Sequence, residues 1–231
     1  MKTANQLVHV VCVDQTEHGF PNYANGMSMS RVTSALQKFY NTCFWPVWGY
    51  RIKLRNATKA APTKPDEWQI IYLDDADAAD ALGYHDLTKD GQPYSKVFTK
   101  TTVDDGEVVS VTTCHELCEM VLDPVANLWA DDGKGNAYAY EACDAVEEDV
   151  FNVDGVAMSN FVTPAYFEPF KHPDGTKFDF LGKLSAPFTM TKGGYSIVDK
   201  GGKVGEIFGS KDKERRFAKE DRRFHRVEYR K

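Results

Sequence analysis

The stretch "SVTTCHELCEMVLDP", residues 110–124, decides how the rest of the chain is interpreted. Residues 108–122 form the strongest helix candidate of the sequence, and the Asp-Pro pair that follows predicts its end, because the residue before a proline resists the α conformation. On an α-helix, residues four apart lie one above the other on the same face. We therefore expect His115 and Glu119 to face the same side of this helix.

Such a row can present an imidazole nitrogen from His115 and a carboxylate oxygen from Glu119 to one cation. Glu116 lies about 100° further round the helix, where it could accept a proton from a metal-bound water without being a ligand. A catalytic metal needs a third protein ligand and an open position. The segment "YEACDAVEED", residues 140–149, offers Glu141 as that ligand and Asp144 as a supporting acceptor, with the two roles interchangeable at this point.

These residues, "HELCE" at 115–119 followed by Glu141-x-x-Asp144, resemble the zincin metallopeptidases, nearer the gluzincin branch than the metzincins. The order of elements upstream is also similar, and the resemblance covers roughly residues 5–150. It implies a zinc peptidase in which an edge strand, expected at residues 93–99, pairs with an extended peptide or protein substrate.

The sequence departs from the gluzincin pattern at Glu119, where that family has a histidine. One histidine and two carboxylates cancel the charge of a divalent cation, whereas two histidines and one carboxylate leave the site positive. A less positive site polarises its bound water more weakly and raises the pKa of that water. Zn²⁺ remains the first candidate, with a harder cation such as Mn²⁺ or Ca²⁺, or a purely structural metal, as alternatives.

Two other readings of nearby residues are weaker. Cys114 and Cys118 are also four residues apart and could form a thiolate site with Cys143, but their row is rotated by about 100° from that of His115, so we assign it to the core. The segment "HDLTKDG", residues 85–91, lacks the glutamate of a calcium loop, since Val97 stands at the twelfth position. We interpret it as a turn.

The remaining elements predict an α+β fold: a zincin-like mixed sheet with a central motif helix, followed by a loop- and strand-rich C-terminal half. Expected elements are a first strand at 6–13, a helix at 28–40, two further strands in "YRIKLRN" and "EWQIIYL", and a short alanine-rich helix in "DADAADALGYHDL", residues 75–87. The predicted organisation is a metal-site domain at 1–150, a packed extension at 151–210 and a basic tail at 211–231.

Composition and charge limit the functional classes. The chain of 231 residues is 42% hydrophobic and 27% charged, as in a globular protein, and no apolar run reaches the ~18 residues of a membrane span. Five cysteines without a framework spacing and a short N-terminal apolar stretch favour a cytoplasmic protein with reduced thiols. The tail holds ten Lys/Arg and five Asp/Glu, so it carries +5 and the rest −11.

Two functional hypotheses follow. The first is a metal-dependent hydrolase of peptide bonds, in which Glu116 activates the metal-bound water. The second is a non-enzymatic structural or assembly protein on a zincin-like scaffold, for example a subunit of a larger particle or virion. The basic tail favours docking on a protein partner, a neighbouring subunit or the acidic body of its own chain over nucleic acid, which the acidic body would repel.

Overall fold

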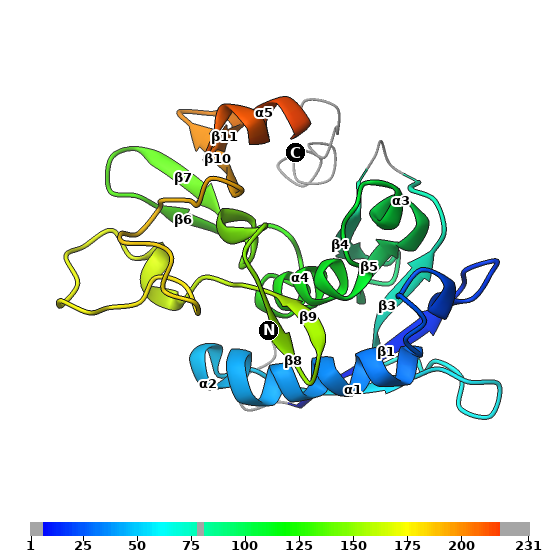
Figure 1. Ribbon diagram of the computed structural model, residues 1–231. Coiled ribbons are helices and arrows are strands. Elements are labelled where there is room, and N and C mark those ends of the chain that lie inside the picture. Colours follow the sequence, from blue (N-terminus) through cyan, green and yellow to red (C-terminus); the bar gives the residue numbers. More distant parts are fainter. Residues whose placement is uncertain (1–6, 78–80, 218–231) are drawn as a thin grey trace.

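The computed structural model describes residues 7–77 and 81–217 (Figure 1). Its main sheet has five strands in the order β2-β1-β3-β5-β4. Four strands run parallel, and β4 pairs antiparallel with β5 at one edge. The strands are β1 (Leu7–Asp14), β2 (Arg51–Asn56), β3 (Trp68–Leu73), β4 (Gly83–Leu87) and β5 (Pro93–Phe98). The predicted α+β class is therefore confirmed.

Helix α1 (Met29–Phe39) is the helix expected at residues 28–40. The Ser28 side chain caps it by accepting a hydrogen bond from the backbone amide of Arg31, which satisfies one of the unpaired first-turn donors. The chain continues through a π-helical turn (Tyr40–Phe44) and α2 (Trp45–Trp48), and then turns at Gly49 in a left-handed conformation. These turns deliver the chain to the edge strand β2.

Helix α4 (Val109–Leu122) is the predicted motif helix, and it is buried along its whole length. It packs against β5 and β4 on one side and against β9 on another, and Figure 1 shows it in the centre of the molecule. A helix buried along its whole length has no face in contact with water. Its polar residues therefore face other protein groups, and each needs a partner.

The second half of the chain adds two small antiparallel sheets. The larger has the order β11-β10-β7-β6, and the smaller is the hairpin β8-β9. Pairing of β10 with β7 joins residues on either side of the predicted boundary at 150. The elements are α3 (Thr99–Asp104), β6 (Trp129–Asp131), β7 (Asn136–Ala139), β8 (Val150–Val153), β9 (Val156–Ser159), β10 (Tyr195–Lys200) and β11 (Lys203–Phe208), with short 3-10 turns η1 (Phe20–Asn22), η3 (Asp144–Val146) and η4 (Pro164–Phe167).

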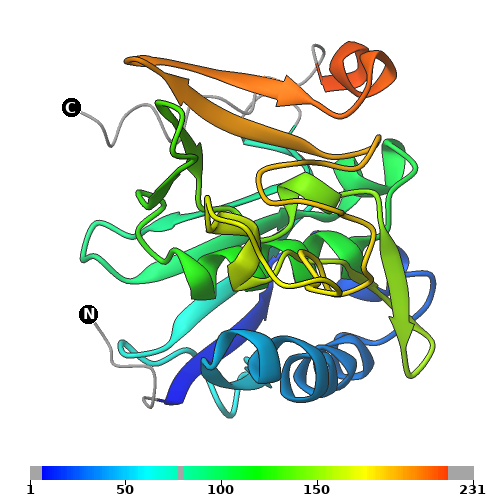
Figure 2. The same cartoon turned by 90° about the vertical axis from the view of Figure 1, so that its left-hand side faces the viewer.

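Helix α5 (Lys211–Phe217) is the beginning of the predicted basic tail, and residues 218–231 lie outside the described part of the chain. Figure 2 shows α5 and the β10-β11 hairpin across α4 from α1. Lys213 is buried and forms ion pairs with Glu147 and Glu148, and Arg216 pairs with Glu148. The described start of the tail thus docks on the acidic body of its own chain.

Two predictions about the edge of the sheet were wrong. Of the segment predicted as an alanine-rich helix, residues 83–87 form strand β4, and residues 78–80 lie outside the described ranges. Strand β5 forms where the edge strand was expected, but it lies between β3 and β4. Strand β4 forms the edge instead. Its pairing with β5 outweighs the helical propensity of the alanine-rich stretch before it. None of the helices in the described ranges has both the length and the apolar character of a membrane span.

Candidate metal centre

The HExxE residues of α4 lie together as the helical spacing predicts. The Nε2 atom of His115 is 3.2 Å from Oε2 of Glu119, and both side chains are buried. Strand β5 fixes this part of the helix, because the Ser95 hydroxyl contacts the carbonyl of Glu116 and the sulfur of Met120. The Glu116/Met120 side of the helix therefore faces β5, and the His115/Glu119 row lies about 100° round the helix from it.

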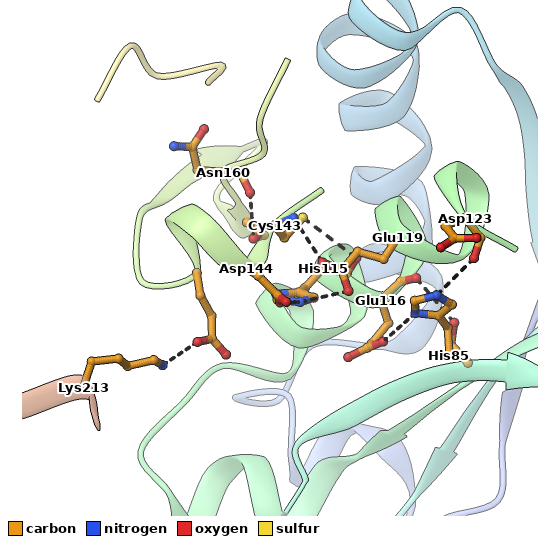
Figure 3. A network of polar contacts seen from close by, with 12 residues as sticks. His85, His115, Glu116, Glu119, Asp123, Cys143, Asp144, Asn160 and Lys213 are labelled. Atoms are coloured by element: carbon orange, nitrogen blue, oxygen red, sulfur yellow. Dashed lines mark hydrogen bonds and ion pairs between the residues drawn. The ribbon is translucent and has the colours of Figure 1, made fainter. Parts of the chain in front are cut away.

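The loop after β7 closes the row from the other side. Asp144, at the start of η3, places Oδ1 3.2 Å from Nε2 of His115. The backbone amide of Cys143 donates to Oε1 of Glu119 at 3.1 Å, and the Cys143 thiol points to the carbonyl of His115. Figure 3 shows Asp144 and Glu119 converging on the His115 ring. Donor atoms of His115, Glu119 and Cys143 all lie within 4.8 Å of one another.

Glu116 faces a different neighbour, a histidine on strand β4. Its Oε2 lies 3.8 Å from Nδ1 of His85, whose Nε2 lies 3.1 Å from the backbone carbonyl oxygen of Asp123 (Figure 3). Gly83 stands directly beside Glu116, since a Cβ built on that glycine would lie 2.9 Å from Cγ and from Oε1 of Glu116. The edge strand thus holds the side chain that was predicted to be the general base.

Glu141, the other predicted carboxylate, belongs to a second group of donors. Atoms of His85, Glu119 and Glu141 all lie within 4.8 Å of one another. Glu141 and Glu119 were predicted as site residues, whereas His85 was not and fell within segments predicted as a short helix and a turn. No local pattern marks His85 as a site residue, because strand pairing alone brings it to α4.

The electrostatics of the cluster follow from its burial. Burial disfavours the charged imidazole of His115, but the charge of Glu119 and hydrogen bonds to Asp144 and Glu119 hold its pKa well above the usual value. Burial, together with Asp144 and Glu141, raises the pKa of Glu119 to about 8 against the opposing effect of His115. For His85, the nearby glutamates outweigh burial and raise the pKa to about 9. The buried carboxylates therefore favour the protonated, positively charged form of the neighbouring histidines.

The donor set fits a divalent cation. Glu116, Glu119, Glu141 and Asp144 are all buried, and in the described part of the chain the ion pairs of Glu116, Glu119 and Asp144 are formed only with histidines. Imidazole, carboxylate and thiolate groups are the ligands that Zn²⁺ takes in proteins. The two groups of buried His, Glu and Cys side chains could hold a metal ion.

The competing cysteine site does not form. Cys114 and Cys118 are fully buried in the main hydrophobic core, and neither belongs to the groups with metal-ligand spacing among the described residues. All five cysteines are free thiols. The row of Cys114 and Cys118 is therefore part of the core packing, as its rotation from the His115 row predicts.

The fold and the site define an α+β protein with a buried histidine-carboxylate cluster on a central helix. Comparison of the chain with protein-family models, with curated proteins and with solved structures finds no match in any of the three.

Proposed function

We propose that the chain is a metal-dependent hydrolase of peptide bonds. The observation that carries the proposal is the convergence of Glu119 and Asp144 on Nε2 of His115, with Glu116 one residue along the same helix. A metal ligand row and an adjacent carboxylate on one helix are the parts that a metal-assisted hydrolase needs.

The proposed ligands are His115, Glu119 and Asp144, with the Cys143 sulfur as a fourth donor within reach. Asp144 takes the role first assigned to Glu141, because its carboxylate oxygen lies 3.2 Å from His115 Nε2. The imidazole, carboxylate and thiol donors favour Zn²⁺ over Mn²⁺ or Ca²⁺. A bound cation would act as a Lewis acid that polarises a substrate carbonyl and lowers the pKa of water.

Glu116 is the proposed general base and acid. Its carboxylate would accept the proton of the attacking water and return it to the leaving amine, a role worth roughly 10²–10⁴-fold in rate. His85 lies beside this carboxylate on strand β4, with Nδ1 3.8 Å from Oε2 of Glu116, and the carbonyl of Asp123 holds its ring. The proposed base thus lies beside the edge strand.

Strand β4 is the proposed substrate-binding edge. Among the described strands it pairs only with β5, which makes it the last strand of the sheet. Addition of a strand there would supply backbone hydrogen bonds, and Gly83 would bring the peptide next to Glu116. The edge strand was expected at β5, and the proposal moves the substrate one strand outward.

The test is cleavage of a peptide library by the Zn²⁺-reconstituted full chain, measured by mass spectrometry. We expect chelator-sensitive cleavage that Glu116→Gln lowers by roughly 10²–10⁴-fold while zinc content is unchanged. Glu17→Gln, at an exposed position, is the matched control. Cleavage by Glu116→Gln at the wild-type rate would remove the proposed mechanism.

The alternative of a non-enzymatic assembly protein was supported by the missing histidine at position 119 and by the turn-rich second half, with the basic tail making subunit contacts. In the described part of that tail, Lys213 and Arg216 are already paired with Glu147 and Glu148 of the same chain. Because these residues already dock on their own chain, the ion pairs argue against an assembly role for residues 211–217.

A further inference from the structure

The two groups of donors at the motif helix are arranged around one shared residue. His115 and Cys143 form one group with Glu119, and His85 and Glu141 form the other group with it. The four side chains that join Glu119 come from strand β4, helix α4 and the loop after β7. The Glu119 carboxylate therefore belongs to both groups of donor atoms.

The hydrogen bonding of His85 prepares it to bind a cation. A backbone carbonyl can only accept a hydrogen bond, so His85 must donate its Nε2–H to the carbonyl of Asp123. A bound cation would displace the proton of the other ring nitrogen, so Nδ1 is the atom available as a ligand. The closest carboxylate oxygen paired with Nδ1 is Oε2 of Glu116, at 3.8 Å, beyond hydrogen-bond length.

A backbone carbonyl that accepts the distal N–H of an imidazole is the usual outer partner of a metal-binding histidine. The Asp123 carbonyl is well placed for this role because it lies at the C-terminal end of α4, where the helix is capped by Asp123. His85 is also buried, which excludes competing hydrogen bonds from bulk water. The ring is therefore fixed in position, with its Nε2–H directed at the carbonyl of Asp123.

Charge balance points to more than one cation. Glu116, Glu119, Glu141 and Asp144 are buried together, and they carry −4 when ionised. Metal binding displaces the ring protons of both histidines; one divalent cation would then leave −2 in the protein interior, whereas two would neutralise the four carboxylates. Buried charge without compensation is costly, so the second cation would stabilise the ionised cluster.

We propose that the chain binds two divalent cations, the first at His115, Glu119 and Cys143 with Asp144 beside the His115 ring, and the second at His85, Glu119 and Glu141, with the Glu119 carboxylate bridging them. This inference rests on the first metal site of the proposed function and extends it, but it does not require peptide cleavage. In two-metal hydrolytic sites the paired cations stabilise both the attacking and the leaving oxygen.

The experiment is a count of bound metal in the full chain. Chelated protein is loaded with Co²⁺, freed of excess metal and measured by inductively coupled plasma mass spectrometry. We expect two equivalents in the wild type, matching the two donor groups, and one in His85→Gln. His9→Gln, on an exposed position of β1, is the matched control and should keep both.

Each result decides between the two sites. One equivalent in the wild type, or two in a folded His85→Gln, overturns the bridged pair and leaves the first site standing. No bound metal overturns both this inference and the proposed function. If His85→Gln fails to fold, Glu141→Gln applies the same test from the loop after β7.

A spectroscopic measurement needs no variant. The electron paramagnetic resonance spectrum of the Co²⁺-loaded wild type should show magnetic coupling between two bridged ions. A spectrum of isolated Co²⁺ only would overturn the proposal even if the metal count were two, because the second ion would then lie elsewhere.

Discussion

Replacement of Gly83 by alanine tests whether strand β4 packs against helix α4 as tightly as the structure indicates. The new Cβ would lie 2.9 Å from Cγ and Oε1 of Glu116 and 2.9 Å from the backbone oxygen of Lys96. Ordinary carbon contacts are about 3.5–4.0 Å, so the alanine needs roughly 1 Å more room. The Glu116 side chain can rotate away, but the Lys96 carbonyl belongs to strand β5 and cannot.

We expect two consequences of Gly83→Ala. Overpacking of this kind costs about 1–3 kcal/mol in the free energy of unfolding. For a chain of this size, each kcal/mol shifts the melting temperature by about 2–4 °C, so the variant should melt roughly 2–12 °C below the wild type. Displacement of Glu116 should also lower peptide cleavage without loss of bound metal, because the ligands His115 and Glu119 do not touch the new methyl group.

Gly205→Ala is the matched control, because a Cβ at that position in β11 meets nothing within 4 Å and its φ is not positive. There the methyl group should raise stability by about 0.4–1 kcal/mol by restricting the unfolded chain. Differential scanning fluorimetry of both variants measures the contrast. A Gly83→Ala protein as stable as Gly205→Ala would refute the close packing of β4 on Glu116.

Two further variants test how the second half of the chain is held. Lys213→Ala removes a buried cation beside Glu147 and should lower the free energy of unfolding in urea by about 3 kcal/mol. Arg215→Ala, on the exposed side of α5, should lower it by less than about 0.5 kcal/mol. Equal effects of the two substitutions would contradict the docking of α5. Asn160→Ala removes the side-chain amide that donates to the fully buried Asp179 at 2.8 Å. We expect thermal melting to show a loss of about 3 kcal/mol or more in the free energy of unfolding. A loss below about 1 kcal/mol would be the contrary result.

The motif helix shows how far sequence reasoning carries. Residues 108–122 were predicted as a helix ended before Pro124, and α4 spans Val109–Leu122. The alignment of His115 with Glu119 was also predicted correctly, because both depend only on the helical repeat and on the backbone restriction before proline. Local rules of this kind do not need knowledge of the rest of the chain.

The edge of the sheet shows where such reasoning stops. Residues 83–87 follow an alanine-rich stretch whose intrinsic preference is helical, yet they form β4 because pairing of His85 with Ser95 places them beside β5. That register brings His85 to Glu116, and no nearby residue announces it. Strand propensity depends on neighbouring strands, which the local sequence does not describe.

The same division applies to the metal centre. The amino-acid sequence by itself determined that His115, Glu116 and Glu119 stand on one helix, since that spacing is a property of the backbone repeat. Only the tertiary structure decided which groups meet them: Asp144 at His115, and His85 at Glu116. Those contacts join residues far apart along the chain, and their formation depends on the packing of a loop and an edge strand around α4, which no local pattern encodes.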